Sequence, residues 1–278
     1  MAYLVVVVFG LVFGSFLNVC IARLPNKESI LVPRSHCPLC QHPIRWFDNM
    51  PLVSYLLLGG HCRDCHARIS PRYPLVEALS ALLLVATFHR FGLSPEFVKY
   101  SALVMMLIVL IFTDLGQRRI PHAVTRFGIS LGLLLSFFIP VDNRPVEWLA
   151  ERMGWPLTGT FSSVLGAIVG AATGGGLFYA VGEAFYILGG RKKQYLGFGD
   201  VMLMLMVGTF LGAPLTLLTI FLGSLGGSVI ALSCLLVAPR FRNYQWPYGT
   251  FLGLAAIYST LDGTRLLEAY LRWSGLTG

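Results

Sequence analysis

Residues 196–240 read LGFGDVMLMLMVGTFLGAPLTLLTIFLGSLGGSVIALSCLLVAPR. After Asp200, no charged residue occurs in this stretch before Arg240. A helix that crosses a bilayer needs about 20 apolar residues, so the stretch is long enough for two crossings. Near its middle, Gly212–Pro214 predicts a turn between a shorter first helix and a longer second one, although a proline there is also compatible with a kink. The stretch therefore predicts two membrane-spanning helices.

The rest of the chain has the same apolar character. Its 278 residues are 55% hydrophobic and 12% charged, against roughly 25% charged residues in an average soluble domain. The mean hydropathy is +0.70. This composition predicts an all-α polytopic integral membrane protein with eight transmembrane helices. The expected spans are residues 2–22, 75–92, 97–115, 123–140, 161–188, 198–212, 215–238 and 246–262.

The distribution of basic residues predicts the orientation in the membrane. If the segment after the first span is cytoplasmic, the inner loops hold 15 of the 21 Lys and Arg residues. Cytoplasmic loops retain such an excess of basic residues, so both termini are expected outside the cytosol. The net charge of +8 then reflects topology in a lipid membrane, and it does not indicate nucleic-acid binding.

A polar insert at residues 23–73 differs from the rest of the chain. It contains two C-x2-C pairs, Cys37–Cys40 and Cys62–Cys65, with 21 residues between them. Two such pairs supply four thiolates to one tetrahedral zinc ion, which leaves no open coordination position and indicates a structural site. Two disulfides are the alternative. They rarely persist in the reducing cytosol, where the charge pattern places this insert.

The insert divides the chain into three expected parts. These are a first transmembrane helix at residues 1–22, a zinc-binding insert at residues 23–73 and a transmembrane catalytic bundle at residues 74–278. Four histidines near the cysteines either replace a sulfur ligand, surround the metal or are ordinary surface residues, and the last role is favoured because four cysteines suffice. They are His36, His42, His61 and His66.

Two acids lie at the ends of apolar segments. Asp114 closes one in IFTDLGQRRIP, and Asp200 opens another in GFGD, so the predicted topology puts both at the cytoplasmic face. Taken singly, Asp200 is explained as a helix N-cap and Asp114 as a helix-end anchor. Taken together, two neighbouring carboxyl groups share a proton and activate water, as in aspartic proteases. Gly197 and Gly199 would let backbone and substrate approach closely.

Other features have simpler expected roles. Glu77 is expected in the first turn of its helix, where a negative charge is favourable and where a structural and a functional role fit equally well. Asn18 is expected to form a hydrogen bond between helices. Glycines at four-residue spacing, from Gly166 to Gly174, indicate a close-packing helix face. The segment WPYGTFLGLAA at residues 246–256 is expected to be re-entrant or to line the same face as the acids.

Together these segments resemble the type IV prepilin leader peptidase family. The segments that carry the resemblance are GSFLNVCIARLP, the two C-x2-C pairs with RYPLVE, DLGQRRIP, GFGD and WPYGTFLGLAA, in that order. The chain departs from the family pattern at Met202, where many members have Lys, at His122, where a smaller polar residue is common, and at Thr250, a proline-like position.

The resemblance implies an aspartic endopeptidase of the bacterial inner membrane in which Asp114 and Asp200 are catalytic. Its substrates would be type IV prepilins or secretion pseudopilins, cut at the cytoplasmic face after Gly and usually before Phe. It also implies transfer of a methyl group from S-adenosylmethionine to the new N-terminus. No Rossmann-like strand and glycine turn marks a site for this cofactor. The sequence does not indicate an oligomeric state.

Two other functions fit parts of the same pattern. A non-catalytic assembly or transport factor would use the zinc insert to dock partners and the acids to cap helices or relay protons. An intramembrane aspartic protease with unrelated substrates would use the same two acids. Cleavage of a pilin precursor distinguishes the three functions.

Overall fold

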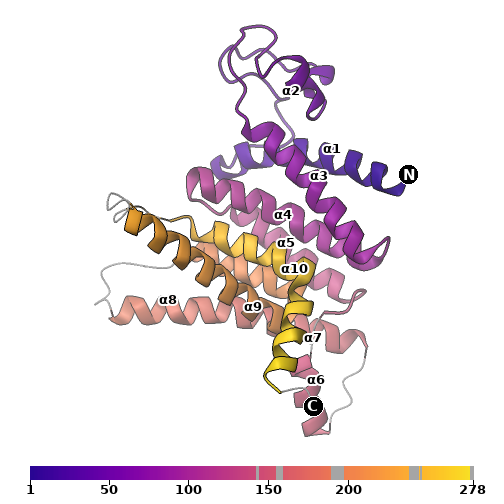
Figure 1. Ribbon diagram of the computed structural model, residues 1–278, viewed down its shortest axis with the longest axis vertical. Helices are drawn as coiled ribbons and strands as arrows, with labels where there is room; N and C mark the ends of the chain where they lie inside the picture. The colour runs from indigo at the N-terminus through magenta and orange to yellow at the C-terminus, as the bar shows by residue number, and fades with distance from the viewer. Residues whose placement is uncertain (142–143, 155–158, 189–196, 238–243, 245, 276–278) are drawn as a thin grey trace. The chain divides into compact units, whose positions relative to one another are not determined.

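The computed structural model describes residues 1–278 except 142–143, 155–158, 189–196, 238–243, 245 and 276–278 (Figure 1). The described residues contain helices and no named strand, and two isolated β-bridges lie in the polar insert. The chain forms two compact units, Met1–Phe97 and Val98–Gly278. The all-α class predicted from the sequence is therefore confirmed.

The first unit is built on two helices, α1 (Ala2–Arg23) and α3 (Arg72–Phe91). They pack closely, since a Cβ atom added at Gly10 would lie 2.5 Å from the Cα atom of Ala81. Asn18 in α1 donates from Nδ2 to the carbonyl of Tyr73 at 3.0 Å, which confirms the expected bond between helices. The insert between them carries the short helices η1 (Leu24–Asn26), η2 (Trp46–Asn49) and α2 (Val53–Leu57).

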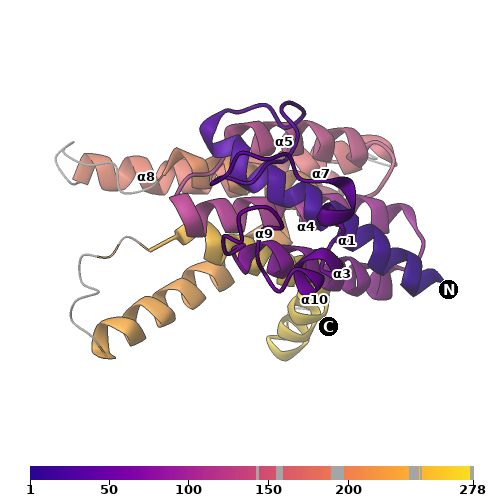
Figure 2. The same cartoon turned by 90° about the horizontal axis from the view of Figure 1, so that it is seen from above.

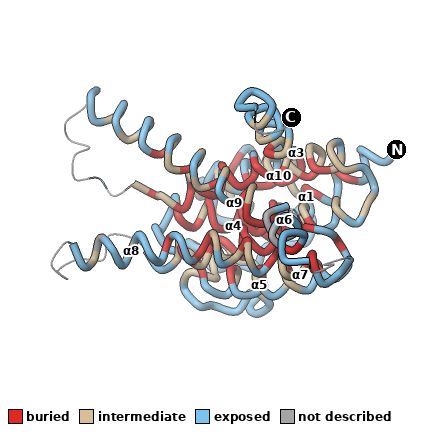
Figure 3. The backbone as a smooth tube through the Cα atoms, turned by 90° about the horizontal axis from the view of Figure 1, so that it is seen from below, coloured by how far each residue is buried: buried red, intermediate tan, exposed pale blue. Residues whose placement is uncertain are grey.

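The second unit holds the remaining helices. They are α4 (Pro95–Gln117), which begins at the end of the first unit, α5 (His122–Ser136), α6 (Arg144–Met153), α7 (Thr160–Ala171), the π-helical turn η3 (Ala172–Gly176), α8 (Leu177–Leu188), α9 (Phe198–Val237) and α10 (Tyr248–Trp273). The core of this unit lies along α4 and the first half of α9, where Leu107, Ile108, Leu203 and Met204 are fully buried (Figure 3). The two acids lie at the ends of these two buried segments.

Helix α9 is interrupted where the sequence predicts a break. Gly212 has a φ of 75° and a ψ of 177°, a non-helical conformation that favours glycine. Before this break α9 packs tightly on α7, because a Cβ atom at Gly170 would lie 2.7 Å from the Cα atom of Gly212. The close-packing face predicted for the glycine-rich segment is thus confirmed at Gly170. Beyond the break, α9 packs on α10 as far as Gly227, where a Cβ atom would lie 3.2 Å from the Phe251 side chain. Only the end of α9 extends away from the packed part of the unit, as does α8 (Figure 2).

Five helical stretches of the described chain are long and apolar enough to cross a membrane. They are Ala2–Asn26, Arg72–Phe91, Pro95–Gln117, Thr160–Leu188 and Phe198–Val237. The 40 residues of the last stretch exceed the roughly 20 that one crossing needs. A multi-pass arrangement is therefore supported, while eight spans remain a prediction. The expected span at 123–140 is too long, because α5 ends at Ser136.

Candidate active site and metal centre

Asp114 and Asp200 are positioned by the ends of two helices. Asp114 lies in the last turn of α4, which ends where Arg118 takes a left-handed φ of 52° and donates its backbone N–H to the Asp114 carbonyl at 2.9 Å. Asp200 is the third residue of α9, so it is not the N-cap residue. The simple capping explanation for Asp200 is therefore wrong.

The two acids converge at Gly249, the second residue of α10. A Cβ atom added at Gly249 would lie 3.1 Å from Asp114 Oδ2 and 3.1 Å from Asp200 Oδ1. The two carboxylate oxygens thus flank a space about as wide as one methyl group. Three helices, α4, α9 and α10, meet at this point. The segment at 246–256 was expected to be re-entrant or to line the face with the acids. It leads into α10 at Tyr248 and lies beside the acids, in agreement with the second alternative.

Asp114 is held by the residue that follows this glycine. Thr250 donates its backbone N–H to Asp114 Oδ2 at 2.7 Å and its hydroxyl to the same oxygen at 3.0 Å. Both side chains are buried, with exposed fractions of 6% for Asp114 and 4% for Thr250. Hydrogen bonds to an ionised acceptor are about twice as strong as neutral ones. From the sequence, Thr250 was visible only as a departure from the family pattern.

An apolar side chain lies between the starts of α9 and α10, beside the acids. A Cβ atom at Gly199 would lie 2.9 Å from Ile120 Cβ, and one at Gly249 would lie 2.9 Å from Ile120 Cδ1. Ile120 therefore packs where α9 and α10 approach each other, and larger residues at these glycines would force the helices apart. Apolar walls reduce solvent screening, which strengthens the interaction between two nearby carboxyl groups.

This arrangement suits general acid–base chemistry. Two neighbouring carboxyl groups disfavour simultaneous ionisation, so a pair of this kind can hold one proton between its members. The ionised member accepts a proton from water while the protonated member donates one to a carbonyl oxygen.

The four cysteines of the insert form a compact cluster in the first unit. Their sulfur atoms all lie within 4.8 Å of one another, and the sulfurs of Cys37 and Cys65 are 3.8 Å apart. A tetrahedral zinc ion with Zn–S bonds of about 2.3 Å requires sulfur separations of about 3.8 Å. All four thiols are free, so the disulfide alternative is not formed. The cluster has the donor set and spacing of a four-sulfur metal site.

The two C-x2-C turns have matching backbone geometry. In the first, Cys37 donates its N–H to the His42 carbonyl at 3.0 Å, and in the second, Cys62 donates to the Ala67 carbonyl at 2.8 Å. The residue after each second cysteine is left-handed, with φ values of 60° at Gln41 and 55° at His66. Each short loop thus returns on itself and presents two sulfurs to the same point.

The neighbouring histidines do not join the cluster. Nδ1 of His36 lies 3.2 Å from the Arg34 carbonyl, and Nδ1 of His61 lies 2.7 Å from the Gly59 carbonyl. Within the described residues the ligand set contains cysteines alone. The group of potential ligand atoms is therefore formed by the four cysteines.

The sulfurs strongly affect one another's protonation. A hydrogen bond from the Cys40 backbone lowers the pKa of the Cys37 thiol to about 7. A hydrogen bond from the His42 backbone favours the Cys40 thiolate, yet loss of solvent and the other three sulfurs raise the pKa of Cys40 to about 12. A bound cation would remove this conflict, because metal coordination deprotonates thiols outright.

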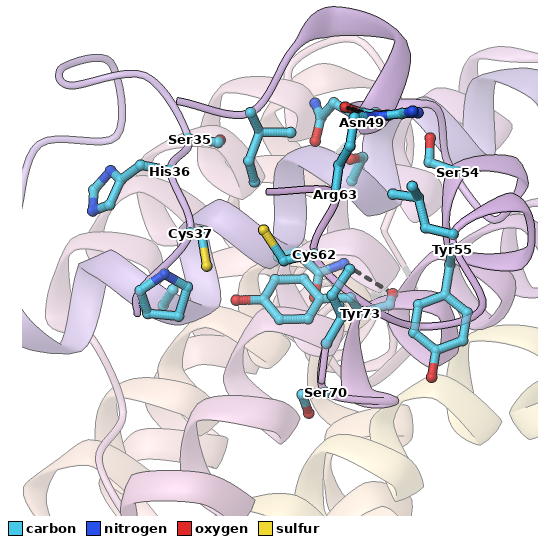
Figure 4. A pocket seen from close by; sticks show the side chains of 18 of the residues that line it. Ser35, His36, Cys37, Asn49, Ser54, Tyr55, Cys62, Arg63, Ser70 and Tyr73 are labelled. Atoms are coloured by element: carbon cyan, nitrogen blue, oxygen red, sulfur yellow. Dashed lines mark hydrogen bonds and ion pairs between the residues drawn. The ribbon is translucent and has the colours of Figure 1, made fainter. Parts of the chain in front are cut away.

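The first unit also contains a cavity of about 570 Å³ between α1, the start of α3 and the insert (Figure 4). Asn18 Oδ1 is buried there and has no hydrogen-bond partner among the described residues. The Glu77 carboxylate, only 8% exposed, accepts the Leu52 N–H at 2.9 Å. Glu77 is the sixth residue of α3, so its predicted place in the first helical turn is wrong. Cys37 and Cys62 also line the cavity, which the cysteine cluster therefore adjoins.

Comparisons with known proteins agree with this arrangement. Residues 8–91 match the Bacterial Peptidase A24 N-terminal domain, and residues 101–232 match the type IV leader peptidase family. No solved structure matches the chain.

Three similar proteins are each named prepilin leader peptidase/N-methyltransferase. The Myxococcus xanthus protein is 37% identical over 86% of this chain and 66% of its own length. The Aeromonas hydrophila protein is 33% identical over 96% of this chain and 92% of its own length. The Pseudomonas aeruginosa protein is 30% identical over 97% of this chain and 93% of its own length. The chain belongs to the type IV leader peptidase family.

Proposed function

We propose that this protein is a membrane-embedded prepilin leader peptidase in which Asp114 and Asp200 are the catalytic pair. The observation that carries the proposal is the convergence of one oxygen from each carboxyl group on the space beside Gly249. Family membership supports the peptidase activity, and the geometry supports the choice of these two acids.

The proposed reaction uses the two carboxyl groups in opposite protonation states. The ionised carboxylate removes a proton from water, whose oxygen attacks the scissile carbonyl carbon, while the protonated carboxyl donates its proton to the carbonyl oxygen. When the tetrahedral intermediate collapses, the C–N bond breaks and the leaving amine takes up a proton. The net reaction consumes one water molecule and restores the shared proton to the pair.

The proposed substrates are type IV prepilins or secretion pseudopilins. The names of the three relatives support this substrate class. The family resemblance implies a short basic leader followed by an apolar helix, with cleavage after Gly at the cytoplasmic face. An active site at helix ends suits such a substrate, because its apolar helix would remain in the membrane while the leader stays in water.

A cleavage assay in lipid vesicles with a pilin precursor tests the proposed pair. We expect Asp114→Asn and Asp200→Asn each to reduce the rate at least about 100-fold. The double variant should be hardly slower than either single one, because members of a catalytic unit act together. The wild-type rate should fall at both low and high pH, since the reaction needs one protonated and one ionised carboxyl group.

The matched control is Asp262→Asn. Asp262 lies on α10 in an exposed ion pair with Arg265 at 3.0 Å, away from the proposed chemistry, and its loss should leave cleavage unchanged. Substantial cleavage by a well-inserted Asp200→Asn protein would contradict the proposal. Absence of cleavage by the wild type would favour an assembly or transport factor, and cleavage of only unrelated membrane proteins would favour a different intramembrane protease.

We also propose that the cysteine cluster binds one structural zinc ion. Sulfur spacing, free thiols and matching turns support zinc at Cys37, Cys40, Cys62 and Cys65. Four sulfurs fill the coordination shell, so the ion would stabilise the insert and would not activate water. This role agrees with a peptidase reaction carried out by carboxyl groups.

The methyltransferase part of the relatives' names leads to a proposal for the cavity of the first unit. We propose that it binds S-adenosylmethionine, which would supply the methyl group when bound. Its volume lies within the range of roughly 300–1,000 Å³ typical of ligand pockets. The Glu77 carboxylate suits the cationic groups of this cofactor, and the unpartnered Asn18 Oδ1 suits a ligand N–H donor. Arg72 Nε, also buried without a partner, suits the ligand carboxylate.

Equilibrium dialysis of S-adenosylmethionine with the purified protein tests this site without relying on catalysis. We expect Glu77→Gln and Asn18→Ala each to weaken binding about tenfold, the effect of losing one hydrogen bond to a charged group. Glu268→Gln on the exposed part of α10 is the control and should bind normally. Unchanged binding by both cavity variants would place the cofactor elsewhere.

A further inference from the structure

Thr250 makes two hydrogen bonds to a single oxygen of the proposed catalytic pair. Its backbone N–H and its hydroxyl both donate to Asp114 Oδ2, at 2.7 and 3.0 Å. The carbonyl of Ile111 is a second acceptor near the hydroxyl, at a longer distance of 3.4 Å. The single hydroxyl proton is therefore better placed for Asp114 than for the backbone of α4.

The oxygen that Thr250 contacts is also the one nearest the meeting point of the two acids. Asp114 Oδ2 lies 3.1 Å from the position that a Gly249 side chain would occupy, and so does Asp200 Oδ1. A carboxylate has about four acceptor sites on its two oxygens. The two donors of Thr250 fix the position of Oδ2 and the plane of the carboxyl group.

We propose that Thr250 is a positioning residue for peptide cleavage. It holds Asp114 Oδ2 toward Asp200 Oδ1 and keeps the two carboxyl groups close enough to act as a pair. The position of Thr250 at the start of a helix makes the constraint firm, because its N–H belongs to the backbone of α10 and cannot rotate away. This role rests on the proposed catalytic pair and adds a third residue to it, from a different helix.

Steady-state cleavage of a pilin precursor by the full-length protein tests the proposal. Thr250→Val keeps the shape and the N–H but removes the hydroxyl, and we expect kcat to fall about tenfold or more while KM changes less than about twofold. Thr250→Ser keeps both donors and should retain nearly the wild-type kcat. If Thr250 had only a structural role, Thr250→Val and Thr250→Ser would not differ in kcat with KM unchanged.

Thr260→Val is the matched control on the same helix. Thr260 is buried, and its hydroxyl donates to the Ala256 carbonyl at 2.7 Å within α10. Thr260→Val removes a comparable hydroxyl. It should match Thr250→Val in thermal stability but keep the wild-type kcat. A wild-type kcat for Thr250→Val, in an assay where Asp114→Asn is inactive, would overturn the role of Thr250 alone. Activity of Asp114→Asn would instead overturn the catalytic pair itself.

Discussion

At the scale of single residues, the candidate active site depends on a missing side chain as much as on the two acids. Gly249 leaves open the space that one oxygen of Asp114 and one of Asp200 share. The acids were recognisable in the sequence because a carboxyl group at membrane depth costs free energy unless it has a role. Gly249 and Thr250 were not, because Gly and Thr are common in membrane helices and Thr250 reaches Asp114 across 136 positions.

We expect Gly249→Ala to reduce cleavage about 100-fold or more, because a displacement of roughly 1 Å at reacting groups has an effect of this size. The added methyl group would lie 3.1 Å from an oxygen of each acid and 2.9 Å from Ile120 Cδ1, so the carboxyl groups must move. Gly226→Ala is the control, because a Cβ atom there meets nothing within 4 Å. Equal rates for the two variants in the precursor assay would show that the shared space is not needed.

At the scale of structural elements, the insert is an example of spacing that determines geometry. Two C-x2-C pairs predicted one cluster, and the structure brings all four sulfurs together through two turns of matching conformation. The cavity beside it was not predicted. Asn18, Glu77 and the insert loops are far apart in the sequence, and only their packing encloses a space.

Metal analysis of the purified protein should find one zinc ion per chain. Zinc binding contributes directly to the folding free energy of such a module. Cys62→Ser combined with Cys65→Ser should therefore release the metal and make the insert more sensitive to protease, with a smaller effect on precursor cleavage. Cys234→Ser, which changes a free cysteine of α9, should retain the metal. Full zinc content in the double variant would contradict the assignment.

At the scale of the whole molecule, apolar runs predicted the helices well and their ends less well. The expected segment at 75–92 begins at Arg72 in the structure, and that at 123–140 ends at Ser136. Hydropathy reports which residues avoid water, whereas helix ends are determined by local backbone conformation and capping. The break in α9 was predicted correctly because Gly and Pro act directly on the backbone conformation.

Reporter tags test the membrane topology. Tags near residue 150 and at Gly278 should report the outside, and tags near residues 27 and 192 should report the cytosol, because basic residues remain on the cytoplasmic side. The two sites expected outside and the two expected in the cytosol serve as controls for each other. A cytosolic tag at Gly278 would contradict the eight-span arrangement.

The contact between Thr250 and Asp114 has a consequence for the biosynthesis of the enzyme. Asp114 and Asp200 leave the ribosome before Thr250, so Asp114 receives its two hydrogen-bond donors only after α10 has been synthesised and has packed beside α4. A nascent chain that carries both acids therefore still lacks part of the proposed active site. Under the proposed catalytic role, cleavage would begin only once the last helix has packed beside the two acids.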